Sequence, residues 1–348
     1  DVSMAAYFIK EESMSFSEYL QHLDSNKQSF VLVQKNMLQT ISDYRKTRYD
    51  IITLPIQSII DSNAEYIDLL LFMSMLDCND IPQDLLRLYK GETMIRDFIH
   101  HLKRFSLITI KSDQAFNKDR YVKFSIHRNT KTIIYNYIAD KVKIKQRVLD
   151  NILNVIHNYI DQELERHNLP KIYALIPHIE ELVQNNKVSE LAKAELYKKL
   201  GLCYFYSSLY TKAKGAFEKD LPTYIKQYGE DHIQTARLSA QLGVIYRNIG
   251  NFEKAKMMLQ DANLIYKNHY SLDNIEYAAV RVYLGNVYCH LGLYDKVRDI
   301  LIPAVNVYKK QFGSSNIQTA WANSYLGIFF SDIGQYFKAK DILKQSLA

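Results

Sequence analysis

The side chains that could do chemistry in this sequence are histidines and carboxylates, but their spacing does not match an enzyme. His178 is followed by Glu180 and Glu181, without the second histidine that a zinc-protease helix places one turn away. His100 and His101 stand next to each other in a basic stretch. The sequence contains no G-x-S-x-G nucleophile elbow and no G-x-x-x-x-G-K-[ST] phosphate loop. We therefore expect no enzyme activity, no metal site and no cofactor within this chain.

The three cysteines also give no sign of a metal or redox site. Cys78, Cys203 and Cys289 are odd in number, far apart and without C-x-x-C spacing. Such usage is typical of a reducing compartment. We expect a cytoplasmic location, either in a bacterium or in a host cell into which the protein is secreted.

Composition favours a helical protein. The chain has 348 residues, 47% of them hydrophobic, with only 11 Gly and 6 Pro, which indicates long helices joined by short loops. The longest apolar stretch, 69–76, is far shorter than the roughly 20 residues of a membrane span, so it predicts a buried helix. The net charge of +6 is mild, and it permits nucleic acid as a partner without indicating it.

One pattern recurs every 42 residues in the second half of the chain. Leu-Gly pairs stand at 200–201, 242–243, 284–285 and 326–327, and each is followed by an aromatic residue, a turn and a small residue in the same register. These followers are Tyr204, Tyr246, Tyr288 and Phe330, then Tyr210, Phe252, Tyr294 and Tyr336, then Ala213, Ala255, Val297 and Ala339. The repeating unit is predicted to be a pair of helices.

The glycines of the repeat have two different explanations. Gly243 and its equivalents fall inside a predicted helix, where Gly costs about 1 kcal/mol relative to Ala. We therefore expect the second helix of the pair to pack too closely for a side chain. Gly250, Gly292 and Gly334 follow seven residues later and are predicted to end the first helix.

The order L-G-x-x-Y, turn Gly, aromatic, Ala resembles the tetratricopeptide repeat (TPR), whose usual period is about 34 residues. The eight additional residues fall around 226–232 and 310–316, and this longer form is similar to the repeats of kinesin light chains and NB-TPR signalling proteins. HEAT and armadillo repeats share the period but lack the signature. The resemblance implies a right-handed α-α superhelix of four TPR repeats over residues 191–348.

Stacked pairs of this kind leave a groove lined by first-helix residues that the packing pattern does not use. Aromatic and arginine side chains among them are typical of binding surfaces, so we expect a protein or peptide ligand there. The alternative for Trp321 is that a further repeat or a capping helix covers it. The candidates are Lys198, Phe205, Tyr206, Arg237, Gln241, Arg247, Asn248, Tyr283, Asn286, His290, Trp321, Tyr325 and Asp332.

Residues 145–190 show helical periodicity and are predicted to be a degenerate leading helix pair. Pro170 is expected to begin its second helix and Pro177 to kink it. Upstream, apolar periodicity predicts helices at 49–60, 64–76, 82–89 and 93–104. Two β runs at 106–110 and 121–126, joined by a polar turn at 117–119, predict a hairpin.

This arrangement of helices and hairpin over 49–144 resembles the winged-helix part of STAND (NB-ARC-type) signal ATPases, on the stretches 70–86, 105–108 and 124–128. Residues 1–48 would then be a helical segment that ends a nucleotide-binding module. In that family a histidine of a Met-His-Asp-like triplet lies near the nucleotide, and His127 occupies the matching place. The resemblance implies ADP or ATP only if a nucleotide-binding domain lies upstream. The alternative is that His127 merely caps a helix or is buried.

Three functions follow from these expectations. The first is the sensor half of a STAND-type signalling protein, with the groove as its recognition surface. The second is a plain TPR adaptor. The third is a winged-helix DNA-binding regulator, for which only Arg96, Lys103 and Arg104 offer basic side chains. Self-association through an uncapped last repeat is a further possibility that the sequence leaves open.

Overall fold

The computed structural model describes residue 15, residue 17 and residues 48–112, 122–141 and 146–345. The chain divides into two compact units, residues 1–159 and 160–348, and the division falls within one long helix. Each unit is described by itself. The predicted helical segment 1–48 and the predicted turn 117–119 lie outside the described residues, apart from positions 15, 17 and 48.

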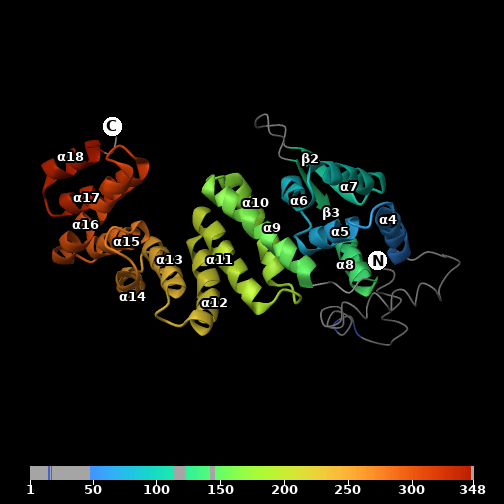
Figure 1. Ribbon diagram of the computed structural model, residues 1–348, viewed down its shortest axis with the longest axis horizontal. Helices are drawn as coiled ribbons and strands as arrows, with labels where there is room; N and C mark the ends of the chain where they lie inside the picture. The colour runs from blue at the N-terminus through green and yellow to red at the C-terminus, as the bar shows by residue number, and fades with distance from the viewer. Residues whose placement is uncertain (1–14, 16, 18–47, 113–121, 142–145, 346–348) are drawn as a thin grey trace. The chain divides into compact units, whose positions relative to one another are not determined.

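The first unit consists of helices around a small sheet, and the four helices predicted for it are confirmed (Figure 1). The sheet joins parts of the sequence that lie far apart in the chain. Its elements are α4 (Arg48–Ser62), α5 (Tyr66–Met75), β1 (Ile81–Pro82), α6 (Gln83–Lys90), α7 (Glu92–Arg104), β2 (Ile108–Ser112), β3 (Val122–Ile126) and α8 (Arg128–Lys141), followed by α9 (Gln146–Glu165), in which the division falls.

The sheet has three antiparallel strands in the order β1-β3-β2. Strands β2 and β3 form the predicted hairpin, with Ile108 opposite Ile126. The short strand β1 was not predicted, because the sequence assigned Pro82 to the start of a helix. Its pairing depends on Phe124, which lies opposite Ile81 but 43 residues further along the chain.

Helix α5 is the centre of the first unit. Its residues from Leu69 to Met75 are all buried, and Phe72 is fully buried. Phe98 of α7 and Phe124 of β3 are also buried to at least 99%. The apolar stretch is therefore a buried helix, as predicted. Among the described residues, no helix is both long and apolar enough to cross a membrane.

The second unit is a stack of helix pairs, and the predicted 42-residue units are confirmed (Figure 1). Each predicted repeat is one pair, and neighbouring pairs pack against each other. The helices are α10 (Leu169–Val183), then the pairs α11 (Glu190–Tyr206) with α12 (Tyr210–Tyr228), α13 (Ile233–Ile249) with α14 (Phe252–His269), α15 (Ile275–His290) with α16 (Tyr294–Phe312), and α17 (Ile317–Asp332) with α18 (Tyr336–Gln345).

The glycine of each Leu-Gly pair lies where its partner helix touches the backbone, as predicted. A Cβ added to Gly243 would lie 2.6 Å from Cγ of Leu259, which is fully buried. The same addition at Gly285 would lie 3.1 Å from Cβ of Leu301. Both leucines come from the second helix of the same pair, so the absent side chain is what brings the two helices together.

The turn between the helices of a pair requires a left-handed residue. Gly250 has φ of 87°, and the two later turn glycines have φ of 70° and 75°. In the first pair the equivalent position is Ser208, which adopts φ of 60° without the freedom of a glycine. In the middle repeat the link to the next pair departs as expected, because Tyr270 is extended where the other repeats have a left-handed Gly.

The leading helices are joined by a buried carboxylate. Glu163 of α9 is 1% exposed and forms ion pairs with Arg166 and Lys171, each at 3.3 Å. Helix α10 has Pro170 in its first turn, as predicted, and it continues through Pro177 to Val183. These contacts fix the start of the helix stack.

Candidate functional site

The first helices of three successive pairs, α11, α13 and α15, line a groove of about 380 Å³. Its wall is mainly apolar, and six of the thirteen predicted binding residues line it. We call it the α11–α15 groove and define it by its lining residues: Lys198, Leu202, Phe205, Tyr206, Phe217, Arg237, Ala240, Gln241, Val244, Ile245, Tyr266, Glu276, Ala279, Val280 and Tyr283.

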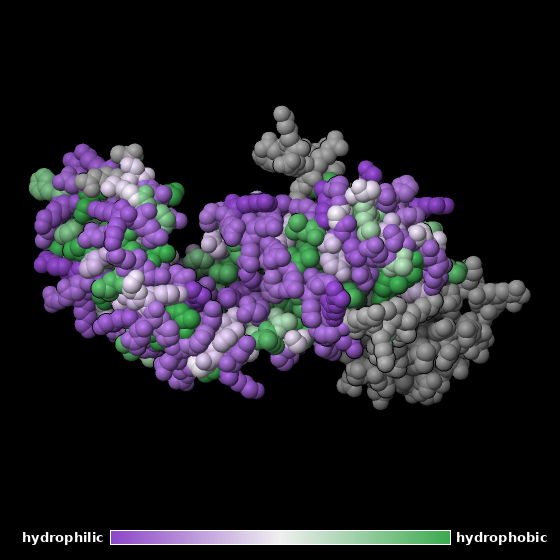
Figure 2. All heavy atoms as spheres, viewed as in Figure 1, coloured by the Kyte–Doolittle hydropathy of each residue, from purple (hydrophilic) through white to green (hydrophobic). Residues whose placement is uncertain are grey.

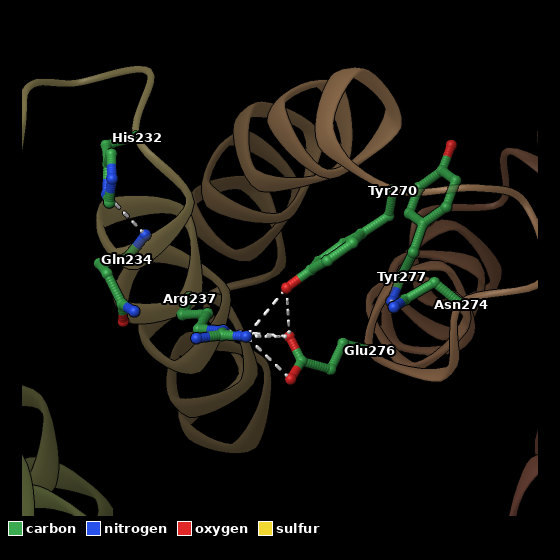
Figure 3. Close-up of polar contacts among 7 residues, drawn as sticks. All are labelled: His232, Gln234, Arg237, Tyr270, Asn274, Glu276 and Tyr277. Carbon is green, nitrogen blue, oxygen red and sulfur yellow. Dashed lines mark hydrogen bonds and ion pairs between the residues drawn. The ribbon is translucent and has the colours of Figure 1, made fainter.

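Helix caps fix the positions of the two polar residues on one edge of the groove (Figure 3). His232 accepts a hydrogen bond at Nδ1 from the backbone N–H of Gln234 at 3.2 Å, and so begins α13. Asn274 accepts one from the backbone N–H of Tyr277 at 3.0 Å, and so begins α15. Residues near the starts of both helices are thereby placed side by side.

Arg237 and Glu276 form a two-pronged ion pair at this edge (Figure 3). Nε and Nη2 of Arg237 donate to the carboxylate at 3.0 and 2.9 Å. Tyr270 accepts from Nη2 at 2.9 Å and donates to the same carboxylate at 3.2 Å. Because its charge is already balanced, Arg237 links neighbouring repeats. Glu276 was not among the predicted site residues.

Arg247 lies beside the groove and has a different environment. Its guanidinium donates to the side-chain oxygens of Asn248 at 2.6 Å, Asn286 at 3.3 Å and Tyr325 at 2.8 Å. It also lies 5.2 Å from the ring centre of Tyr283, which lines the groove. All these partners are neutral, so the positive charge is held in place without being balanced.

Trp321 belongs to an aromatic cluster next to Arg247. Its ring centre lies 5.2 Å from Tyr283, 5.4 Å from Tyr325 and 5.6 Å from Tyr308. Burial raises the pKa of Tyr283 to about 12, helped by Tyr325 and opposed by the charge of Arg247. Trp321 is half-buried, so part of it is packed among these rings and part is accessible to a ligand.

A polar cluster lies at the other end of the groove. Lys198 donates to the hydroxyl of Tyr224 at 3.3 Å, and that hydroxyl donates to Glu195. Asp220 is fully buried nearby, and neither of its carboxyl oxygens has a hydrogen-bond partner among the described residues. Burial, together with the charge of Glu195 and against that of Lys198, raises the pKa of Asp220 to about 7. No sequence signal distinguished Asp220 from a surface acid of α12.

Two of the predicted binding residues lie away from the groove lining. His290 stacks on Phe252 of the preceding repeat, with ring centres 4.3 Å apart. Asp332 is exposed at the end of α17. His290 therefore contributes to packing between repeats.

His127, the predicted nucleotide-sensing residue, is exposed at the start of α8. Its Nδ1 accepts a hydrogen bond from the backbone N–H of Asn129 at 3.3 Å, which makes it a helix cap, as in the alternative interpretation. Its role toward a nucleotide stays a prediction. Within the described part of the chain, no group of three or more His, Cys, Asp or Glu side chains is placed to hold a metal ion.

Comparison with known proteins identifies the repeats. A family model described as tetratricopeptide repeat matches residues 192–267 and 276–348. A search of curated proteins gave no match. Similar solved structures include kinesin light chain TPR-like repeats of Podosopora anserina (16% identity, 56% of this chain and 92% of that chain, TM-score 0.45) and BtubC (BKLC) from P. vanneervenii (16% identity, 60% and 83%, TM-score 0.46).

YrrB, a TPR protein with an unusual peptide-binding site, is also similar (17% identity, 55% of this chain and 82% of that chain, TM-score 0.35). The family match starts two residues into α11 and covers the four helix pairs that carry the 42-residue pattern. Residues 192–267 and 276–348 of this chain are tetratricopeptide repeats.

Proposed function

We propose that the chain is a binding scaffold without catalytic activity, and that its α11–α15 groove binds a segment of a partner protein. The single observation that carries this proposal is the groove itself. TPR repeats are in general protein- and peptide-binding modules, and here three successive first helices leave a groove of about 380 Å³ between them. That volume falls in the range of sites that bind small ligands or side chains.

The apolar part of the groove favours an apolar or aromatic side chain of the partner. Leu202, Phe205, Val244, Val280 and Tyr283 all contribute to the wall. A side chain that enters such a wall gains about 25 cal/mol for each Å² of apolar surface removed from water. Anchors of this kind supply most of the affinity in protein interfaces.

The unbalanced charge of Arg247 favours a carboxylate on the same partner. Among the described residues Arg247 forms no ion pair, and its three hydrogen-bond acceptors are neutral. Because Arg247 stacks on Tyr283, the charge lies next to the apolar wall. Hydrogen bonds between a guanidinium and a carboxylate are about twice as strong as neutral ones. The proposed ligand is therefore a peptide with an apolar side chain close to an acidic group.

The test is selection of peptides from a random display library on the whole chain, followed by titration of the selected peptides against Arg247→Gln. The proposal predicts at least a tenfold loss of affinity for acidic peptides. It also predicts a smaller loss when the acidic residue of the peptide is replaced by its amide. Peptides that bind Arg247→Gln as well as the parent contradict the assignment of Arg247.

A second proposal concerns the first unit. We propose that residues 66–126 are a winged-helix domain and that the chain is the sensor half of a STAND-type signalling protein. Support comes from the element order α5-β1-α6-α7-β2-β3 and the strand order β1-β3-β2, in which β2 and β3 form the wing. The test is the ADP content of the protein as the cell makes it. Bound ADP that is released by His127→Ala supports the proposal, and a protein without ADP contradicts it.

A further inference from the structure

The last helix pair exposes apolar side chains at positions that the earlier pairs bury. Leu343 of α18 is 39% exposed, whereas its equivalents Leu301 and Leu259 are fully buried. Ile328 of α17 is 43% exposed, whereas Val244, two repeats earlier, is 8% exposed. Figure 2 shows apolar atoms among the polar ones on the surface around α17 and α18.

Two further positions follow the same rule. Ile317, at the start of α17, is 83% exposed, while Ile275 and Ile233 are half-buried at the same place in their repeats. Tyr336, at the start of α18, is 68% exposed, against 37% for Tyr294. We call Ile317, Ile328, Tyr336 and Leu343 the end face.

The chain itself shows what kind of structure fits the end face. Helix α15 packs on α13 and α14, and α17 packs on α15 and α16. In each case the first helix of one pair covers these positions of the pair before it. A TPR helix pair is therefore the surface to which the end face is complementary.

We infer that the end face binds the end face of a second copy of this chain, in a two-fold symmetric dimer. The opposite end of the stack does not offer a partner surface, because α10 already packs on α11. Head-to-tail addition of copies is thereby blocked, whereas a two-fold contact pairs the same patch with itself.

The charges of the last pair agree with a contact centred on α17. Asp332 is the only acidic or basic side chain of that helix, and it stands at the last position. Helix α18 carries Lys338, Lys340 and Lys344 but only one acid, Asp341. A contact centred on α18 would bring these lysines together, so α17 forms the middle of the interface and the lysines stay at its rim.

The experiment is sedimentation velocity of the whole chain over a range of concentrations. The parent is expected to form a dimer in the micromolar range, as suits a small interface. Ile328→Lys is expected to raise the dissociation constant at least 100-fold, because it places two like charges in the middle of the contact. Ile328 is already partly exposed, so the variant keeps its fold, and circular dichroism checks this.

The matched control is Leu264→Lys, which makes the same kind of change at a side chain of α14 that is 61% exposed. It should dimerise like the parent. A parent that stays monomeric at about 200 µM overturns the inference, since a specific interface of even modest size associates below that concentration. Species that grow beyond the dimer, or a dimer that Ile328→Lys leaves intact, overturn it as well.

Discussion

Replacement of Gly243 by alanine tests whether close helix packing is the reason for the glycine of the Leu-Gly pair. In an open helix this change gains about 1 kcal/mol. At Gly243 the new Cβ would lie 2.6 Å from Cγ of Leu259 and 3.3 Å from the backbone oxygen of Ala255. Relief requires movement of a buried side chain and of the backbone behind it. Overpacking of this kind costs about 1–3 kcal/mol, so we expect Gly243→Ala to lower the free energy of unfolding by about 1 kcal/mol.

The chain offers a matched control and an intermediate case. Gly215 lies inside α12, and a Cβ added there would have no neighbour within 4 Å. Gly215→Ala should therefore raise the free energy of unfolding by about 1 kcal/mol. Gly285, where the nearest atom is 3.1 Å away, should fall between the two.

The assay is urea unfolding followed by the fluorescence of Trp321, the only tryptophan of the chain, which lies in the repeats. Circular dichroism gives the total loss of helix in parallel. If Gly243→Ala stabilises the repeats as much as Gly215→Ala does, the explanation by close packing is refuted.

Three further predictions concern the polar residues of the repeats. Ser208→Gly should raise the free energy of unfolding by about 1 kcal/mol in the same assay, because φ of 60° suits glycine. Asp220 has its pKa raised from 3.8 to about 7, so the folded state binds the proton more tightly. Stability should therefore fall as pH rises from about 4 to 7, and Asp220→Asn should remove that fall in urea titrations at several pH values. Glu276→Gln should lower stability by at most about 1 kcal/mol, since the ion pair with Arg237 is half exposed.

The repeats could be predicted from the sequence because their packing repeats with it. The Leu-Gly pairs fixed the helices and their contacts, since the same close approach recurs every 42 residues. The contacts of the site were not predicted. Arg237 meets Glu276 and Arg247 meets Asn286, each 39 residues along the chain, and only the angle between neighbouring first helices determines that spacing.

Two other features carry no local signal. Strand β1 is two residues long and depends on pairing with β3, far along the chain. The left-handed turn of the first repeat has Ser208 where the later repeats have glycine. In both cases tertiary contacts impose a conformation that the local sequence does not favour.

The measurement that tests the binding groove most directly is titration of selected peptides against a variant with the groove filled. Trp321 occupies the same place in its repeat as Ala279 does in the preceding one, so Ala279→Trp fills the groove at a position that accepts tryptophan elsewhere in the fold. Met257→Trp, at a side chain of α14 that is 57% exposed, is the control. We predict that Ala279→Trp weakens binding at least tenfold and that Met257→Trp leaves it unchanged. Equal affinity of the parent and both variants would contradict recognition in the α11–α15 groove.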